Sequence, residues 1–159
     1  MNFRTGIGYD VHRLEPGGRL VLGGVTVPFT SGLTGWSDAD VLTHAVMDAL
    51  LGAAGLGDIG RHFPPGDPQF KGIASLELLR QVGEMLTRAG WRTGNIDAVI
   101  AAEQPRLSPH IPAMQVNLAD ALGLEPGAVS IKATTTEQLG FVGREEGMAA
   151  WATVLISTG

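Results

Sequence analysis

Hydrophobic residues recur along this chain with two different periods, which separate the expected strands from the expected helices. Alternation with a period of two, or a short apolar run, predicts strands over residues 2–13, 20–27, 96–102, 129–133 and 148–156. Gly23-Gly24 interrupts the second segment, which is therefore one strand or two short ones. Apolar residues spaced three and four apart predict helices over residues 37–54, 74–88 and 111–122, with Gly90 and Gly123 ending the last two. Residues 30–36 are expected to form a turn-rich loop.

The helix predicted over residues 37–54 has a broad apolar arc that should face the core. Ser37 is its expected N-cap, and the carboxylates of Asp38 and Asp40 would complement the dipole of the first turn. The residues of the arc are Val41, Leu42, Ala45, Val46, Ala49 and Leu50. Asp40, His44 and Asp48 are four residues apart and therefore lie together on the other side of the helix.

Length and composition narrow the classes of function. The 159 residues predict a single domain, residues 1–159, and the absence of cysteine leaves His, Asp and Glu as metal ligands. A formal net charge of −5 without basic clusters argues against nucleic-acid or anionic-membrane binding. The longest apolar run, residues 148–156, is shorter than the roughly 20 residues of a membrane span, and no charged-then-apolar leader is seen. We therefore expect a soluble protein of the bacterial cytoplasm.

The first predicted strand places a carboxylate beside an imidazole. Asp10 and His12 are two residues apart, so their side chains leave the strand on the same face. Two polar side chains pointing into water from an edge strand would give the same pattern. His44 is a candidate third ligand, which would leave one tetrahedral position of a zinc ion open, and Asp48 or Asp40 would orient its ring. Alternatively, His44 is a surface histidine in ion pairs with carboxylates four residues away.

Residues 52–72 are rich in Gly and Pro, which forbids regular structure and leaves backbone amides free to bind phosphate. A plain surface loop would have a similar composition, although long loops in compact domains are often functional. Asp58 is placed to accept hydrogen bonds from sugar hydroxyls. His62 is equally consistent with a surface residue and with a ligand.

The segment after the strand at residues 129–133 has two interpretations that are compatible with each other. Thr134 and Glu137 match a helix capping box. Alternatively, threonine hydroxyls contact phosphate while Glu137 binds a hard cation such as Mg²⁺. Arg144, among glycines, is either a solvated turn residue or an anion contact.

Six motifs together resemble those of the 2-C-methyl-D-erythritol 2,4-cyclodiphosphate synthases, in the family's order and over nearly the whole chain. They are Gly6-x-Gly8-x-Asp10-x-His12, Ser37-Asp38-x-Asp40, His44-Ala45-x-x-Asp48-Ala49-Leu50-Leu51-Gly52, Leu56-Gly57-Asp58-Ile59-Gly60, Pro109-His110-Ile111-Pro112 and Lys132-Ala133-Thr134-Thr135-Thr136-Glu137-x-Leu139-Gly140.

This resemblance implies an α+β fold of two layers, with helices packed on one face of a mixed four- to five-stranded sheet. The other face would form a homotrimer with active sites between subunits. The implied activity is that of a phosphorus–oxygen lyase of the non-mevalonate route to isoprenoids. It converts 4-diphosphocytidyl-2-C-methyl-D-erythritol 2-phosphate to the cyclic diphosphate and CMP by metal-assisted intramolecular phosphoryl transfer.

The resemblance also assigns roles to residues. Asp10, His12 and His44 would hold Zn²⁺, while Glu137, with Thr135 nearby, would be catalytic and place Mg²⁺ or Mn²⁺ between the phosphates. Asp58 and Gly60 would bind the methylerythritol part, and residues 102–107 with Thr134 would form a cytidine pocket contributed by a neighbouring subunit. Phe141 and Arg144 would line a central cavity of the trimer that takes an isoprenoid diphosphate. The remaining substrate contacts are expected among Asp10, His12, Trp36, Ser37, Ile59, Phe63, Pro64, Pro65, Gly66, Asp67, Ala102, Glu103, Gln104, Pro105, Arg106, Leu107, Ser108, Thr135, Thr136 and Glu137.

Two positions depart from the family pattern. Trp36 stands where the family usually has a phosphate-contacting histidine, and an indole offers a single donor and no charge. Pro65 replaces an aspartate after Phe-Pro, which removes a carboxylate and an amide donor. Neither change affects the expected metal ligands.

Two other functions fit the same residues. One is a zinc-dependent phosphohydrolase of nucleotide diphosphates, in which the three ligands generate hydroxide. The other is a non-catalytic trimer that binds an isoprenoid diphosphate and has structural metals.

Overall fold

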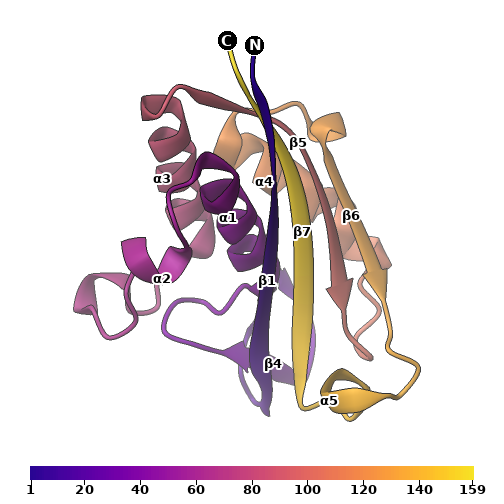
Figure 1. The fold of residues 1–159 in the computed structure, drawn as a ribbon. Helices are drawn as coiled ribbons and strands as arrows, with labels where there is room; N and C mark the ends of the chain where they lie inside the picture. The colour runs from indigo at the N-terminus through magenta and orange to yellow at the C-terminus, as the bar shows by residue number, and fades with distance from the viewer.

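A five-stranded mixed sheet in the order β4-β1-β7-β5-β6 forms one layer of the protein (Figure 1). The computed structural model describes all of residues 1–159. β5 and β6 run parallel and the other neighbours antiparallel. The strands are β1 (Phe3–Pro16), β4 (Ser31–Thr34), β5 (Trp91–Ala101), β6 (Val129–Thr134) and β7 (Gly147–Thr158), with β2 (Leu20–Leu22) and β3 (Val25–Val27) forming a separate ribbon.

The second layer consists of three helices on one face of the sheet (Figure 1). They are α1 (Val41–Ala54), against β1 and β7, α3 (Ser75–Arg88), against β5, and α4 (Ile111–Leu122), against β6. Two short helices, α2 (Ile59–His62) and α5 (Gly140–Gly143), and 3₁₀ turns at Pro68–Phe70, Ser108–His110 and Pro126–Ala128 lie in the connections. This arrangement confirms the predicted two-layer α+β fold.

The core lies between the sheet and the helices. α1 is buried almost all round because it also packs against α3. Fully buried side chains from each element meet there, among them Leu42, Met47, Leu50, Leu79, Leu86, Ile96, Ile100, Met114 and Leu118. The helix carrying His44 is therefore held firmly against the sheet.

Two glycines of β1 allow α1 to approach the strand closely. A Cβ at Gly6 would overlap the carbonyl oxygen of Ala49, and one at Gly8 would overlap that of Ala45. Asp10 and His12 follow on the same face of the strand, at the same two-residue interval. The close approach thus brings both side chains to His44 of α1.

The opposite face of the sheet carries exposed apolar side chains. Phe3, Ile7, Tyr9 and Val11 of β1 are exposed, as is Trp151 of β7. The Tyr9 and Trp151 rings are 5.1 Å apart between centroids. Toward one end, α5 covers the small buried cluster of Ala101, Val142 and Ala149.

Four local predictions were wrong. Residues 52–72, expected to lack regular structure, contain the end of α1, the helix α2 and a 3₁₀ turn, because the carboxylates of Asp58 and Asp67 cap the two short helical turns. Residues 31–34, predicted as loop, form β4 because they pair with Arg13–Pro16 of β1. The N-cap of α1 is Asp40 and not Ser37, since the Asp40 carboxylate accepts from the amides of Gly23, Gly24 and Thr43. The capping box at residues 134–137 is absent: Thr134 Oγ1 donates to the carbonyl of Thr135, and α5 begins only at Gly140.

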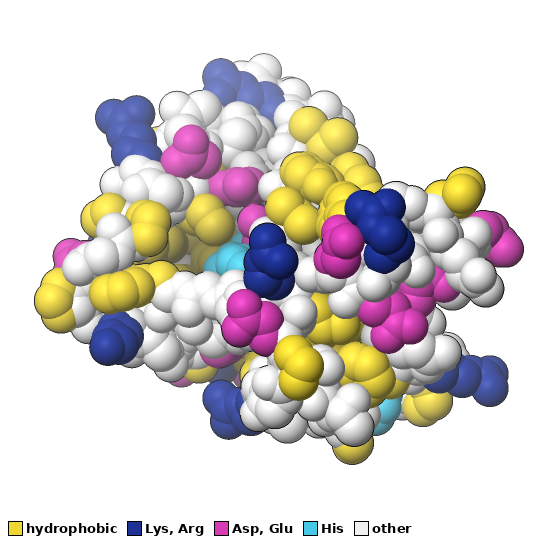
Figure 2. All heavy atoms as spheres, turned by 90° about the horizontal axis from the view of Figure 1, so that it is seen from below, with side chains coloured by type: hydrophobic (Ala, Val, Ile, Leu, Met, Phe, Trp, Pro, Cys, Tyr) yellow, Lys and Arg dark blue, Asp and Glu magenta, His cyan; other side chains and the backbone are white.

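Both termini lie side by side at one end of the sheet (Figure 1). The amide of Thr158 donates to the carbonyl of Asn2 at 3.0 Å. From the opposite end, Figure 2 shows a hollow with a histidine at its floor and hydrophobic side chains beside it. None of the helices combines the length and the apolar character needed to cross a membrane.

Candidate active site and metal-binding triad

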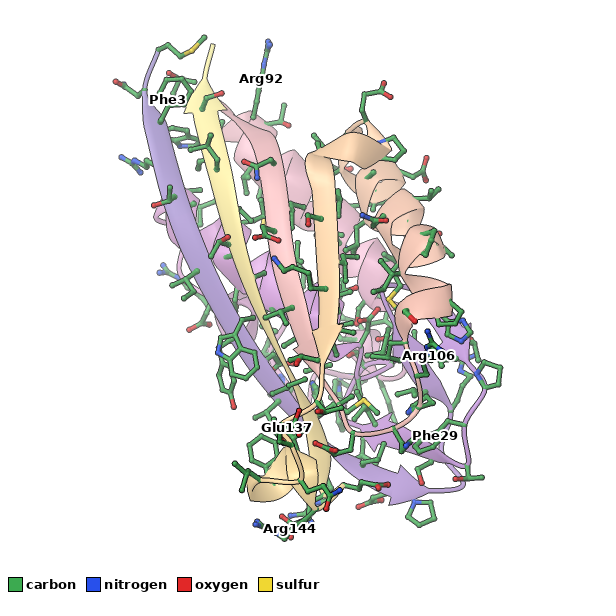
Figure 3. The ribbon with its side chains drawn as sticks, turned by 90° about the vertical axis from the view of Figure 1, so that its right-hand side faces the viewer. Phe3, Phe29, Arg92, Arg106, Glu137 and Arg144 are labelled. Atoms are coloured by element: carbon green, nitrogen blue, oxygen red, sulfur yellow. The ribbon has the colours of Figure 1, made fainter.

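Most of the predicted site residues lie toward the end of the sheet remote from the termini. Figure 3 shows Glu137 and Arg144 at that end, with Phe3 and Arg92 at the other. The residues nevertheless fall into separate groups: one around His44, one around residues 102–108, and one at α5.

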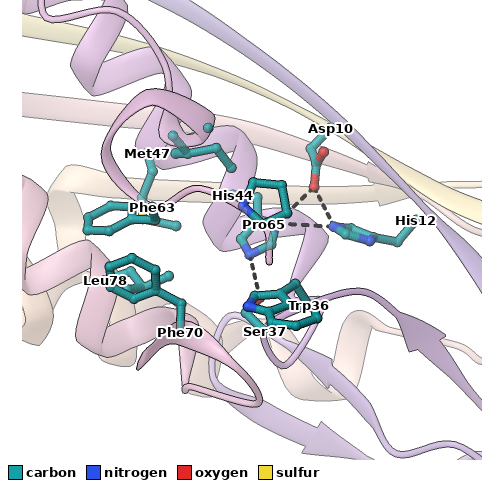
Figure 4. A pocket seen from close by; sticks show the side chains of 12 residues that line it. Asp10, His12, Trp36, Ser37, His44, Met47, Phe63, Pro65, Phe70 and Leu78 are labelled. Carbon is teal, nitrogen blue, oxygen red and sulfur yellow. Dashed lines mark hydrogen bonds and ion pairs between the residues drawn. The ribbon is translucent and has the colours of Figure 1, made fainter. Parts of the chain in front are cut away.

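Asp10, His12 and His44 converge as predicted (Figure 4). Asp10 Oδ2 is 2.9 Å from His12 Nε2 and 3.1 Å from His44 Nδ1, and the two nitrogens are 3.1 Å apart. In a tetrahedral zinc site with bonds of about 2.0–2.2 Å, ligand atoms lie roughly 3.3 Å apart. The three atoms therefore need to separate only slightly to hold such an ion.

The partners of the two rings fix which nitrogen carries the proton. His12 Nδ1 is 2.8 Å from the carbonyl oxygen of Thr34, which can only accept. In the neutral ring, the proton is therefore on Nδ1, and Nε2 offers a lone pair toward Asp10.

His44 is oriented by a serine and a carboxylate outside the triad. Its Nε2 is 2.9 Å from Ser75 Oγ and 3.1 Å from Ser37 Oγ. Ser75 Oγ donates its own proton to the Asp38 carboxylate, which also accepts from the Ser75 amide at 2.9 Å. Ser75 must then accept from His44 Nε2, which leaves a lone pair on Nδ1.

This arrangement corrects the prediction that Asp40 or Asp48 orients the imidazole. Asp40 is fully buried as the N-cap of α1. Asp48 accepts from the amide of Ile59 at 2.8 Å and so ties α1 to α2. Both acids contribute to the scaffold that carries His44.

With both rings neutral, the triad consists of three acceptor atoms that face one another. Burial opposes ionisation of Asp10, but hydrogen bonds that the rings of His12 and His44 donate when they take up a proton outweigh it and lower its pKa to about 2. Burial disfavours the charged form of His12, and the hydrogen bond to Asp10 overrides this and raises its pKa. An ionised carboxylate and two lone pairs at this separation suit a cation. The residues present therefore fit a divalent metal ion.

A pocket of about 210 Å³ adjoins the triad. Its other walls are largely apolar, and the ring centroids of Phe63 and Phe70 are 5.4 Å apart in an edge-on arrangement (Figure 4). Of the predicted substrate contacts, this pocket is lined by Asp10, His12, Trp36, Ser37, Ile59, Gly60, Phe63 and Pro65. Pro64, Gly66 and Asp67 belong to the same segment but do not line the pocket, and Asp58 caps α2 by accepting from the Arg61 amide at 3.0 Å.

A second pocket, of about 270 Å³, contains the residues predicted to bind cytidine. It is lined by Ala102, Glu103, Gln104, Pro105, Arg106, Leu107 and Ser108, together with Ala133, Thr134 and Thr135. None of these residues lines the pocket at the triad. Within one chain, the two pockets are thus separate.

Glu103 joins this second pocket to the loop that carries Glu137. Its Oε1 accepts from the Thr136 amide at 2.8 Å, from Thr136 Oγ1 at 3.1 Å and from the Gln138 amide at 3.3 Å. Glu137 and Gln138 have φ values of 53° and 61°, which residues other than glycine rarely adopt. The Glu103 carboxylate therefore stabilises a strained loop.

Phe141 lines a hollow together with Val11, His12 and Glu146, and Arg144 is the C-cap of α5. The guanidinium of Arg144 donates to both carboxylate oxygens of Glu146, at 3.0 and 3.2 Å. These hydrogen bonds raise the pKa of Arg144 and lower that of Glu146. The two residues are exposed and separate from the triad pocket.

The model of one known family, the YgbB family, matches residues 3–157. The chain belongs to the YgbB family. Relatives named 2-C-methyl-D-erythritol 2,4-cyclodiphosphate synthase are 65% identical in Dehalococcoides mccartyi strain 195, covering 96% of this chain and 98% of the relative, and 59% identical in Nostoc, covering 98% and 94%. The YgbB assignment thus confirms the resemblance seen in the motifs.

Solved structures have the same fold as this YgbB protein. The bifunctional IspDF of Campylobacter jejuni matches with a TM-score of 0.96 and 44% identity, covering 99% of this chain and 43% of that chain. The CDP complex of Plasmodium falciparum IspF matches with a TM-score of 0.86 and 28% identity, covering 99% and 97%. Another CDP-bound synthase matches with a TM-score of 0.89 and 35% identity, covering 97% and 100%.

The roles of Ser75 and Asp38 in orienting His44 were not predicted from the sequence. Ser75 is 31 residues from His44 and 37 from Asp38, so no local spacing indicates the contact. Met47, Phe70 and Leu78 were also not predicted to line the pocket, because apolar side chains of this kind are common in core helices and loops.

Proposed function

We propose that this member of the YgbB family converts 4-diphosphocytidyl-2-C-methyl-D-erythritol 2-phosphate to 2-C-methyl-D-erythritol 2,4-cyclodiphosphate and CMP. The observation that carries the proposal is the Asp10–His12–His44 triad beside a pocket in a chain 65% identical to a named synthase. The 2-phosphate oxygen bonds to the β-phosphorus, and the bond from that phosphorus to the oxygen retained by CMP breaks. No water is consumed, which makes the reaction that of a phosphorus–oxygen lyase.

We assign Zn²⁺ to Asp10, His12 and His44, and Mg²⁺ or Mn²⁺ to Glu137. Bound there, the two ions would neutralise phosphate charge and help to align the attacking and leaving oxygens. Imidazole and carboxylate suit zinc, whereas an exposed carboxylate beside phosphates suits a hard cation. Thr135 accepts from the Glu137 amide at 3.3 Å and lines the second pocket, which supports a catalytic placement for both residues.

The chain's own groups would hold the substrate in the reactive geometry. Ile59 and Gly60, with Asp58 at the start of α2, would bind the methylerythritol part in the triad pocket. Residues 102–107 with Thr134 would bind the cytidine part, in a pocket that Ser108 and Thr135 also line. The apolar side chains of Phe63 and Phe70 would keep water from the phosphates, which favours internal attack over hydrolysis.

We further propose a homotrimer, with each active site formed between two subunits. The two pockets share no residue within one chain, so a substrate that fills both needs a second copy. The exposed apolar side chains of Ile7, Tyr9, Val11 and Trp151 provide a surface for that copy. A central cavity with Phe141 and Arg144, suited to an isoprenoid diphosphate, stays a prediction, as do the cytoplasmic location and the single domain.

Product analysis tests the activity directly. The purified protein, supplied with Zn²⁺ and Mg²⁺, is incubated with the diphosphocytidyl substrate and followed by ³¹P NMR. We expect cyclic diphosphate and CMP in equal amounts. A linear methylerythritol phosphate product would instead support the phosphohydrolase, and binding without turnover would support the non-catalytic trimer.

Removal of His44 tests the metal assignment. We expect His44→Ala to lose zinc and CMP release while keeping its circular dichroism spectrum, because two ligands hold the ion poorly. His110→Ala, which removes a histidine outside both pockets, serves as the control and should retain both properties. An active, zinc-free His44→Ala protein would contradict the assignment.

A further inference from the structure

Trp36 lines the triad pocket together with Phe63, Pro65 and Phe70, which belong to the segment of residues 63–72 (Figure 4). The indole Nε1 donates to the carbonyl oxygen of Asp67 at 2.9 Å. The Trp36 carbonyl accepts from the amide of Gly72 at 2.8 Å. One residue therefore binds the segment near its middle and at its end.

We propose that Trp36 is a positioning residue that clamps residues 63–72 over the triad pocket before substrate binds. The indole has a single N–H, and Asp67 already accepts it. The ring is consequently not a hydrogen-bond donor to a phosphate in this arrangement. Its contribution to the active site passes through the segment that it holds.

A cation on the segment adds to this contact. The ammonium of Lys71 lies 5.9 Å from the centre of the Trp36 ring, within the range of a cation–π interaction. Trp36 is 38% exposed, so this contact is partly solvated and weaker than a buried one. It supports the clamp but does not replace the hydrogen bond.

The side chain of Asp67 is also fully engaged within the segment. Its Oδ1 accepts from the Gln69 amide at 3.1 Å, and its Oδ2 accepts from Gln69 Nε2 at 2.7 Å. The backbone carbonyl of Asp67 thus binds the indole of Trp36 while its side chain binds Gln69. These contacts give a structural role to a residue that we predicted to contact substrate. Pro65 and Phe70, which lie on either side of Asp67 in the sequence, line the pocket.

The functional consequence rests on the proposed cyclisation. Because residues 63–72 are already ordered before substrate binds, binding carries no further entropic cost for ordering them. The ordered segment also keeps water away from the phosphates from the moment of binding. Loosening the clamp should accordingly weaken substrate capture more than it slows the chemical step.

Trp36→Phe tests the clamp because it removes the N–H and keeps an aromatic ring under Lys71. We expect amide exchange across residues 64–72, measured by mass spectrometry without substrate, to accelerate by roughly fivefold, the effect of losing one ordinary hydrogen bond. With substrate, KM should rise by a larger factor than kcat falls. Peptides from α1 and β1 should exchange at the wild-type rate, which would show that the variant is folded.

Gln69→Ala is the matched control, since it removes a side-chain hydrogen bond in the same segment and leaves the Trp36 bond in place. It should alter exchange and KM less than Trp36→Phe does. Unchanged exchange in Trp36→Phe would overturn the clamp, as would a fall in kcat at constant KM. If the wild-type chain released no CMP, the proposed function would fail, whereas the exchange measurement would still decide whether Trp36 holds the segment.

Discussion

The two ring nitrogens of His44 have separate tasks. Nδ1 faces Asp10 and His12, whereas Nε2 is held by Ser75, whose hydroxyl is in turn held by Asp38. Hydrogen bonds of this kind fix the tautomer and the direction of a metal-binding imidazole. Much of the metal affinity should therefore depend on a buried serine that does not touch the metal.

Ser75→Ala should lower the affinity for Zn²⁺ by about 10–100-fold while the fold is kept. Competition with a chromophoric chelator measures the change. Asp38→Asn should lose less, because an amide oxygen still accepts from Ser75. Wild-type affinity in Ser75→Ala would show that the packing of α1 alone orients the ring.

The pH dependence of stability has an identifiable source in Asp48. Burial, the largest influence, raises its pKa above 3.8 and outweighs the hydrogen bond from Ile59. The folded protein thus binds this proton more tightly than the unfolded chain does, so Asp48 lowers stability as pH rises above 3.8. Asp48→Asn should have a higher Tm than the wild type at pH 7, and the difference should shrink toward pH 4. A constant difference in Tm would exclude this titration as its source.

The triad was predictable at the residue scale, and its supports were not. Asp10 and His12 share a strand face, and His44 belongs to a helix with clear periodicity, so local spacing indicated all three. Ser75 and Asp38 meet only through the folded chain. Glu103 was predicted to contact substrate, but its hydrogen bonds to Thr136 and Gln138, 33 and 35 residues away in the sequence, were not predicted.

At the scale of elements, the packing of α1 on β1 determines the geometry of the site. The glycines at positions 6 and 8 permit contact between the strand and the helix backbone. Any side chain there would separate the two elements that carry the ligands. The spacing Gly-x-Gly-x-Asp-x-His is therefore a packing motif and a ligand motif on one strand face.

Gly8→Ala should destabilise the protein by about 3 kcal/mol, because its Cβ would force β1 away from Ala45. Denaturant unfolding measures the loss, and zinc binding should weaken in parallel. Gly52→Ala is the same change on the exposed side of α1, where a Cβ meets no atom, and should stabilise by about 0.5–1 kcal/mol. Equal effects in the two variants would contradict the packing argument.

The element boundaries that were wrong depended on distant partners. Residues 31–34 lack a clear alternation and become a strand only because β1 extends far enough to pair with them. Ser37 and Asp40 are both good N-caps by residue type. The amides of Gly23 and Gly24 decide in favour of Asp40, and no local pattern indicates that contact.

At the scale of the whole molecule, both faces of the sheet carry apolar side chains, but helices cover only one of them. Helices cover one face, and the other exposes a strip of aromatic and aliphatic side chains. The strand periods predicted the elements, whereas the strand order and the parallel pairing of β5 with β6 came only with the structure. Local sequence patterns do not specify which strands become neighbours.

Ile7→Lys should convert the proposed trimer to monomers, because Ile7 is 71% exposed within the apolar strip and a buried lysine would lack a partner. Sedimentation velocity measures the change. Zinc should still bind, since all three ligands come from one chain, while CMP release should be lost. Val116→Lys places the same charge on an exposed apolar position of α4 and should change neither assembly nor turnover. An active monomeric Ile7→Lys protein would refute the shared site.

The adjacent termini have a consequence for tethering. Phe3 and His12 are nine positions apart on the extended strand β1, which is a distance of about 30 Å. A protein fused to either terminus would thus lie beyond the end of the sheet that is farthest from the triad and would leave the pocket open. The same geometry would allow a second domain fused at either terminus to leave the pocket accessible.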